Sequence, residues 1–289
     1  MLLSVGMEYG GQCKEVLDFY ASVFPDASVM VRNYKEMPNA GVFGMTGIGL
    51  ELVWKSFVSI SYGKYDLCID MADSFLAAMN HQLDYAIPFY KPVICVLGEE
   101  EQAKQLFRKL YGDERSFEEL RLGEYPDKYG SRWSYEYGTE AGICYCLEFD
   151  GFCADVIAYY EKAFDITATE VVRYGESLYA DKVRGKDKIY NALLEFTDGG
   201  RKYAMKLRDS MKSAVDNLYE YDPTQLLFYQ MLYNPILNFS DKDNAYLQNS
   251  FQKLSVGAKL NKPFAISDNA DVCGSLIDKY GICWNFYNL

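Results

Sequence analysis

The chain carries the same pattern twice, and this internal repeat limits its fold more than any other feature of the sequence. Residue 7 aligns with residue 147, and the alignment runs without a gap to residues 34 and 174. The identical pairs are Glu8/Glu148, Gly11/Gly151, Cys13/Cys153, Val16/Val156, Tyr20/Tyr160, Phe24/Phe164, Val31/Val171 and Tyr34/Tyr174. A repeat of this length indicates a duplicated structural unit, so the fold must be one that a single chain can build twice.

Two further matches follow in the same order. Gly63, Asp73 and Ser74 correspond to Gly199, Asp209 and Ser210. The most specific match is Asp-Lys-Tyr-Gly-x-x-Trp, which spans residues 127–133 and recurs at 278–284. Because a chain of 289 residues is long for one domain, the three matches predict two tandem domains, residues 1–139 and 140–289.

Hydrophobic periodicity predicts the same elements in both copies. Strands are expected at 3–9 and 143–149, where apolar residues alternate, and helices at 13–24 and 153–164, where they recur at helical spacing. Strands at 28–34 and 168–174 and a glycine-turn hairpin follow in each copy. The second part of each copy again predicts a strand followed by a helix. In the first copy the strand is expected at 92–97 and the helix at 99–111. In the second copy the strand is expected at 235–239 and the helix at 241–254, with Ser240 as N-cap. Each copy therefore reads β-α-β-β-β twice, an α+β fold. Residues 37–50 read as an irregular insertion, and no structure is predicted for 75–91 and 211–233.

This order of elements resembles the PhnB-like branch of the vicinal oxygen chelate superfamily, which includes glyoxalases, extradiol dioxygenases and bleomycin-resistance proteins. The residues that carry the resemblance are Leu147-Glu-Phe-Asp-Gly151, Tyr159-Tyr160 with Phe164, Phe19-Tyr20 with Phe24, the Asp73-Ser74 and Asp209-Ser210 pairs, and the two Asp-Lys-Tyr-Gly-x-x-Trp segments. The usual Asp-Pro-Phe-Gly turn of the family is replaced by Asp-Lys-Tyr-Gly in both copies.

The resemblance implies tandem glyoxalase-like domains, each of paired βαβββ modules that form an incomplete barrel. Helices would cover the outside, and the concave side would hold a small molecule. The polar faces of the two opening strands would then point into the cavities. Those faces carry Ser4, Gly6 and Glu8 in the first copy and Cys144, Cys146 and Glu148 in the second.

Enzymes of this superfamily hold a divalent metal with histidine and glutamate side chains from the cavity strands. Transferring those positions to this sequence gives Ser4, Cys144, Val93, Leu237, Ser134 and Asn285. The single histidine, His81, has no ligand-spaced partner nearby. We therefore predict no metal and no cofactor.

The candidate ligand-binding residues each have a structural alternative. They are Ser4, Glu8, Trp133, Cys144, Cys146, Glu148, Asp209 and Trp284. The glutamates could be cavity acids and catalytic bases, or strand-end carboxylates paired with a cation. Asp209 could act in the site or cap a turn, as could Asp73. The tryptophans could stack on a ligand or close the core, and the cysteines could be a soft-metal or redox pair, or packing residues.

Composition limits the partners. There are 29 basic and 41 acidic residues, a net charge of −12, which disfavours nucleic acid and anionic membranes. No apolar run reaches the ~18 residues of a membrane helix, no basic residue precedes Glu8 to make a secretory signal, and the eight cysteines form no CxxC pair. We expect a cytoplasmic protein that is a monomer or a homodimer.

Three functions remain open from the sequence. The leading hypothesis is a metal-free protein that binds a small organic molecule. The second is a lyase or dioxygenase-type enzyme of the same superfamily with an atypical carboxylate site, built on Glu8 or Glu148. The third is a protein-interaction scaffold whose cavities are filled by side chains.

Overall fold

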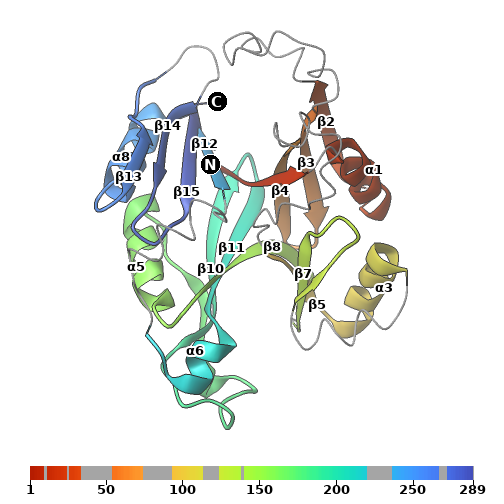
Figure 1. The fold of residues 1–289 in the computed structure, drawn as a ribbon, viewed down its shortest axis with the longest axis vertical. Helices are drawn as coiled ribbons and strands as arrows, with labels where there is room; N and C mark the ends of the chain where they lie inside the picture. The colour runs from red at the N-terminus through yellow and green to blue at the C-terminus, as the bar shows by residue number, and fades with distance from the viewer. Residues whose placement is uncertain are drawn as a thin grey trace, which may run out of the picture. The chain divides into compact units, whose positions relative to one another are not determined.

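The fold is known from a computed structural model, and it comprises two compact units (Figure 1). One unit is Ser4–Ile143, and the other is Cys144–Leu289 together with Met1–Leu3. The structure describes residues 1–9, 12–24, 26–33, 54–73, 93–112, 124–137, 140–219, 236–266 and 272–288. The predicted insertion at 37–50, the segment 75–91 with His81, and residues 220–233 lie outside the described residues.

The first copy contains two modules of strands and one helix each. The first module comprises β1 (Leu2–Tyr9), α1 (Cys13–Val23), β2 (Ser28–Asn33), β3 (Trp54–Tyr62) and β4 (Tyr65–Asp73). Its strands lie in the order β1-β4-β3-β2. The described part of the second module comprises β5 (Val93–Gly98), α3 (Glu100–Tyr111), β6 (Glu124–Pro126) and β7 (Arg132–Tyr137), with the strand order β5-β7-β6.

The second copy repeats this plan. Its first module comprises β8 (Gly142–Phe149), α5 (Cys153–Phe164), β9 (Thr169–Arg173), the short 3-10 helix η3 (Tyr174–Glu176), β10 (Ile189–Asp198), β11 (Arg201–Asp209) and α6 (Met211–Asp216). Its second comprises β12 (Ile236–Asp241), α8 (Asn244–Leu254), β13 (Lys259–Lys262), β14 (Val272–Ile277) and β15 (Cys283–Asn288). The strand orders are β8-β11-β10-β9 and β12-β15-β14-β13.

One pairing rule holds in all four modules: the opening strand lies parallel to the closing strand, while the remaining described pairs within a module are antiparallel. The parallel pairs are β1 with β4, β5 with β7, β8 with β11, and β12 with β15. A helix after the opening strand makes this return possible, because parallel strands need a long crossover. The predicted α+β class, with tandem βαβββ modules in open mixed sheets, is confirmed.

Aromatic packing fills the space between helix and strands. In the second copy, the ring of Phe164 at the end of α5 lies 5.5 Å from Phe196 on β10, 4.9 Å from Phe239 on β12 and 5.0 Å from Trp284 on β15. In the first copy, Phe24 stacks on Trp133 at 6.0 Å. Rings at these separations add favourable contacts to the burial of apolar area, so the repeated phenylalanine is a core residue in both copies.

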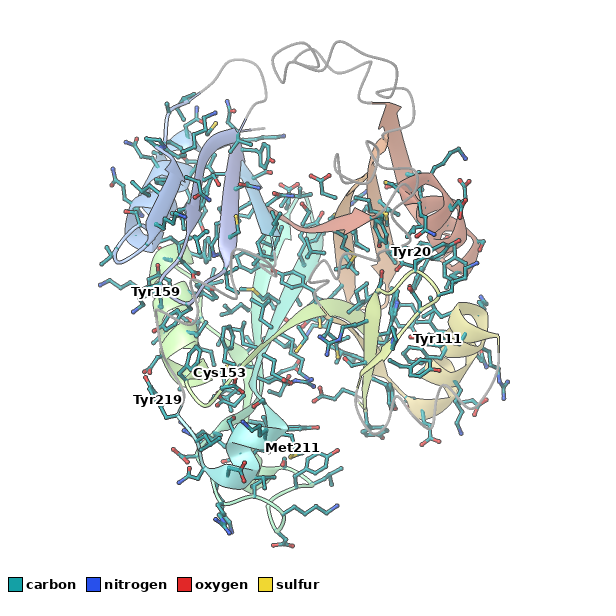
Figure 2. All side chains as sticks on the ribbon, in the orientation of Figure 1. Tyr20, Tyr111, Cys153, Tyr159, Met211 and Tyr219 are labelled. Atoms are coloured by element: carbon teal, nitrogen blue, oxygen red, sulfur yellow. The ribbon has the colours of Figure 1, made fainter. Side chains whose placement is uncertain are left out.

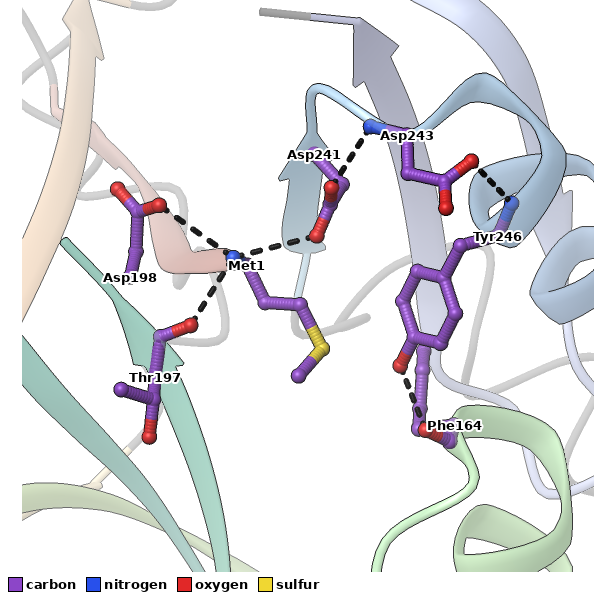
Figure 3. Close-up of polar contacts among 7 residues, drawn as sticks. All are labelled: Met1, Phe164, Thr197, Asp198, Asp241, Asp243 and Tyr246. Atoms are coloured by element: carbon purple, nitrogen blue, oxygen red, sulfur yellow. Dashed lines mark hydrogen bonds and ion pairs between the residues drawn. The ribbon is translucent and has the colours of Figure 1, made fainter.

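The helices α5 and α8 are in contact, and Figure 3 shows a hydrogen bond from the first turn of α8 to the end of α5. The Tyr246 hydroxyl on α8 donates to the Phe164 carbonyl at 2.5 Å. The predicted N-cap is wrong, because Ser240 is a buried residue of β12 and the Asp243 side chain accepts the N–H groups of Ala245 and Tyr246 instead. In the same region the Met1 amino group contacts the Thr197 carbonyl, Asp198 and Asp241.

The predicted hairpins are present. The strands β10 and β11 are joined at Gly199-Gly200, both with positive φ, and β3 and β4 are joined at Gly63 with a φ of +63°. At Gly63 a Cβ atom would lie 2.0 Å from the carbonyl oxygen of Ala141, so the chain tolerates no side chain there.

Candidate functional site

The Asp-Lys-Tyr-Gly turn of the second copy is organised around a buried aspartate. Asp278 is 3% exposed. One oxygen, Oδ1, accepts the backbone N–H groups of Tyr280 at 2.9 Å and Ile282 at 3.0 Å. The other, Oδ2, accepts the Trp284 indole N–H at 2.9 Å and the Tyr160 hydroxyl at 2.7 Å. Burial raises the pKa of Asp278, while these four hydrogen bonds lower it.

The turn of the first copy has the same four contacts. Asp127 accepts the N–H groups of Tyr129 at 2.9 Å and Ser131 at 3.0 Å through Oδ1. Its Oδ2 accepts the Trp133 indole N–H at 3.1 Å and the Tyr20 hydroxyl at 2.7 Å. The most specific repeat in the sequence is therefore a structural device that ties the closing strand to the first helix of its domain.

The two tryptophans lie in the core. Trp133 and Trp284 have no exposed surface, and each indole N–H is bound to the aspartate of its own turn. Their positions correspond to the structural alternative named above, in which they close the core.

Asp209 joins three segments of the second copy. Its side chain accepts the N–H of Cys153, the first residue of α5, at 2.9 Å and the N–H of Ile189, the first residue of β10, at 2.8 Å. It is 1% exposed, and burial raises its pKa. The next residue, Ser210, caps α6 by accepting the Ser213 N–H at 3.1 Å. The pair thus organises the turn after β11.

The two candidate glutamates differ in what the structure describes. The Glu148 carboxylate is 39% exposed and binds the Arg208 guanidinium through Nε at 2.9 Å and Nη2 at 2.8 Å. This two-point contact is the strand-end pairing that the sequence left open as the alternative to a cavity acid. Glu8 lies on β1 opposite Ala72 of β4, and its side chain lies outside the described residues.

The remaining candidates are buried on the opening strands. Ser4 is 3% exposed on β1, and Cys144 and Cys146 are 0% and 1% exposed on β8. All of β8 except Glu148 is buried. In register, Cys146 lies beside Lys206 of β11.

Lys206 is the residue that the sequence analysis missed. It is 1% exposed, which is rare for a lysine side chain. Its ammonium lies 5.8 Å from the centroid of the Tyr190 ring. In register it lies between Cys146 on β8 and Leu193 on β10. The signal available in the sequence was the alternation of side chains along β11. Its apolar residues are Tyr203, Met205 and Leu207, and its basic residues are Lys202, Lys206 and Arg208.

Lys206 and Arg208 lie on the side of the sheet that α5 does not cover. Phe196 of β10 contacts α5 through Phe164, and its cross-strand partner on β11 is Tyr203. Because side chains alternate between the two faces of a strand, the even-numbered residues of β11 point away from α5. We call this the helix-free face of the β8/β11/β10 sheet.

The first copy carries the opposite charge at the equivalent position. Gly6 of β1 lies beside Asp70 of β4, just as Cys146 lies beside Lys206. Asp70 precedes Asp73 by the same three residues that separate Lys206 from Asp209. Two residues further along the opening strands, Glu8 lies opposite Ala72, whereas Glu148 lies opposite Arg208. The duplicated scaffold therefore presents different chemistry in its two copies.

The residues at the positions that the sequence resemblance assigns to a metal do not fit a divalent metal. Val93 and Leu237 are buried apolar residues, and Asn285 donates from Nδ2 to Asn238 Oδ1 at 3.1 Å. The register places Cys95 beside Ser134 and Asn238 beside Asn285, so neither closing strand meets a histidine or a glutamate there. In the parts of the chain that the structure describes, no group of three or more histidine, cysteine, aspartate or glutamate residues is placed to hold a metal ion.

No helix within the described ranges is both long enough and apolar enough to cross a lipid bilayer.

No protein-family model and no curated protein matches the sequence. Among solved structures, glyoxalase I from Zea mays aligns over 99% of this chain and 92% of its own, with 11% identity and a TM-score of 0.56. A Pseudomonas aeruginosa protein covers 50% of this chain and 93% of its own at 20% identity, with a TM-score of 0.38. A PhnB protein from Bacillus cereus covers 50% and 96% at 19% identity, with a TM-score of 0.32.

The whole-length alignment, together with the four modules, defines the class of fold. The chain has the fold of glyoxalase I, built as two tandem domains. At these identities the comparison establishes the fold, and the activity has to be argued from the residues.

Proposed function

We propose that this protein binds a small organic anion on the helix-free face of the β8/β11/β10 sheet, without a resident metal. The observation that carries the proposal is the burial of Lys206. Lys206 and Arg208 lie two residues apart on this face, and the Lys206 ammonium lies beside the Tyr190 ring, so the face combines basic groups with an aromatic surface.

Neighbouring groups support an anionic ligand with an unsaturated or aromatic part. Arg208, two residues along the same face, offers a planar guanidinium that already holds one carboxylate, that of Glu148. The Tyr190 ring near the Lys206 ammonium supplies an apolar surface. Binding sites of small ligands combine such apolar walls with a few placed polar groups.

The metal-free part of the proposal follows from the donor set. Serine, valine, leucine and asparagine replace histidine and glutamate at the positions where the fold's enzymes hold their metal, and a lone cysteine pair lacks a third ligand. We expect elemental analysis to find substoichiometric metal after incubation with zinc, manganese, iron and nickel and desalting. One equivalent per chain would contradict this part.

The two other hypotheses stay predictions. The carboxylate enzyme would use Glu8 or Glu148 as its base, and the Glu148 carboxylate is engaged by Arg208. The interaction scaffold needs cavities closed by side chains.

The test compares two lysines of one strand. Lys206→Met removes the buried ammonium and keeps the chain length, whereas Lys202→Met removes an ammonium that is 48% exposed on the same strand. With benzoate, pyruvate and 2-oxoglutarate as probes, we expect at least one to raise the Tm of the wild type by about 3 °C near saturation. Lys206→Met should abolish that shift, and Lys202→Met should keep it.

The proposal is wrong if the shift survives in Lys206→Met, or if both variants lose it equally. It is also wrong if none of the three carboxylates shifts the wild type.

A further inference from the structure

The segment between β9 and β10 forms a small lobe with α6 in the second copy (Figure 1). Figure 2 marks this lobe by Met211, the first residue of α6. Backbone hydrogen bonds close the lobe, because the N–H groups of Arg184 and Gly185 donate to the Ala214 carbonyl at 3.1 and 2.8 Å. We call residues 174–188 together with α6 the β9–β10 lobe.

The lobe has a small core of its own. Tyr174, Val183 and Ala214 are buried in it, and the rings of Tyr179 and Tyr190 pack against them. These two rings are only partly buried. They therefore form the edge of the core, where each ring keeps an exposed part.

The two edge rings lead from the lobe to the anion site at Lys206. The ring centroids of Tyr179 and Tyr190 lie 5.8 Å apart, and the Tyr190 centroid lies 5.8 Å from the Lys206 ammonium. The ammonium of Lys182 lies 5.8 Å from the Tyr179 centroid. Each ring of this pair, which we call the tyrosine wall, therefore has an ammonium group near it.

A wall of this kind suits a ligand that is both aromatic and anionic. Aromatic rings attract one another at centroid separations of ~4.5–7 Å in offset or edge-to-face arrangements, and this adds to the burial of apolar area. A ligand whose carboxylate is attached directly to its ring can meet the Lys206 ammonium and the Tyr190 ring together, since these lie 5.8 Å apart. An aliphatic oxo acid makes the first contact and lacks the second.

The first copy does not repeat this combination. Counted from the two hairpin turns, Tyr190 corresponds to Trp54 and Lys206 corresponds to Asp70. An aromatic residue is thus present in both copies, while the charge is reversed. The segment in the place of the lobe, residues 35–53, contains no tyrosine. A lobe tyrosine together with a basic strand residue is therefore specific to the second copy.

We propose, on the basis of the anion site at Lys206, that the tyrosine wall makes this site selective for aromatic carboxylates. Lys206 meets the carboxylate, and Tyr190 and Tyr179 contact the ring of the ligand. The β9–β10 lobe is then the element that determines specificity. Aromatic acids bind more tightly than saturated acids of similar size.

The experiment compares two probes of similar size, benzoate and cyclohexanecarboxylate, by calorimetry on the full chain. Both carry one carboxylate, and only benzoate has an aromatic ring. We expect the wild type to bind benzoate about fivefold more tightly, which is the effect of one aromatic pair. Tyr190→Leu should remove this preference and Tyr179→Leu should reduce it, whereas Tyr190→Phe keeps the ring and should keep the preference.

The matched control is Leu178→Ala. Leu178 belongs to the same lobe, is 93% exposed and has no ring, so this variant should leave the preference unchanged. Tyr179 and Tyr190 are altered separately, so that if one leucine variant fails to fold the other still decides the result.

Several results would overturn this selectivity. The wild type binds both probes equally or binds neither, both leucine variants keep the preference for benzoate, or Leu178→Ala removes it. Binding of pyruvate without either probe, lost in Lys206→Met, would leave the anion site in place and contradict the aromatic ligand. If Lys206→Met binds both probes as tightly as the wild type does, the anion site itself is wrong.

Discussion

The two copies agree where helix meets sheet and differ on the opposite side of the sheet. On the helix side, each domain places a buried aspartate, an indole and a tyrosine in the same four-bond arrangement, with donor–acceptor distances between 2.7 and 3.1 Å. On the helix-free face, Gly6 beside Asp70 is replaced by Cys146 beside Lys206. The scaffold has been kept, and the helix-free face has changed.

We use this difference between the two copies to choose the surface that we propose as a ligand site. Lys206 is buried and Asp70 is half-buried, so the charge at this position of the sheet reverses sign between the copies while the fold is kept. The surface that we propose to bind a ligand belongs to the second copy.

The largest expected effect on stability concerns the helix side of the sheet, where the two copies make the same contacts. Asp278→Ala leaves the Trp284 indole, the Tyr160 hydroxyl and two backbone N–H groups without their acceptor. We expect a loss of about 4 kcal/mol of unfolding free energy, because each buried donor without a partner costs about 1–3 kcal/mol and the effects overlap. Urea denaturation followed by tryptophan fluorescence measures it.

The matched variant in the first copy is Asp127→Ala, which breaks the same four contacts. Equal losses in the two domains would support a common structural device. A loss below about 1 kcal/mol in either copy would show that the turn holds without its aspartate, and the comparison would fail.

The sequence was sufficient to predict the repeat, the βαβββ order and most element positions. The repeat is encoded in residues that cannot vary without loss of packing, such as Phe164 and Trp284. The start of α8 was placed too early, because Ser240 and Asp243 are both good capping residues and only the length of β12 decides between them.

The candidate site was harder to predict, because the recognisable sequence motifs belong to the core and the turns of the fold and not to the site. The conspicuous residues Trp133, Trp284 and Asp209 lie in the core or in turns. Lys206 belongs to no motif, and its burial follows from strand alternation together with pairing between β8 and β11. Pairing between distant strands is not visible in one sequence, so a buried lysine looks like a surface lysine until the sheet is known.

An intermediate effect sharpens the comparison on the helix-free face. Glu148→Gln removes the ion pair with Arg208 but keeps the shape of the side chain. Since the two side chains are 39% and 22% exposed, we expect a loss below about 1 kcal/mol in urea denaturation. A loss of several kcal/mol would mean that this pair belongs to the scaffold after all, and Glu8→Gln would then have to be compared with it.

The smallest effect concerns a thiol that the first copy lacks. Cys283 aligns with Arg132 between the glycine and the tryptophan of the repeated segment, and burial raises its pKa to about 11. In the unfolded chain the thiol ionises near its usual pKa of 9.0. The folded state therefore keeps a proton that the unfolded state loses between these values, so this thiol's contribution to stability falls as the pH rises from 9 to 11.

Alkylation by iodoacetamide tests this thiol directly, with modification at Cys283 followed by peptide mass spectrometry. At pH 8 we expect slow reaction in the folded protein and fast reaction in urea, because the thiolate is the nucleophile. Cys283→Ser should leave the reaction of the other cysteines unchanged. Rapid modification of native Cys283 at pH 8 would show a reactive thiol on the helix-free side of β15, and the difference between the copies would then extend to a further surface.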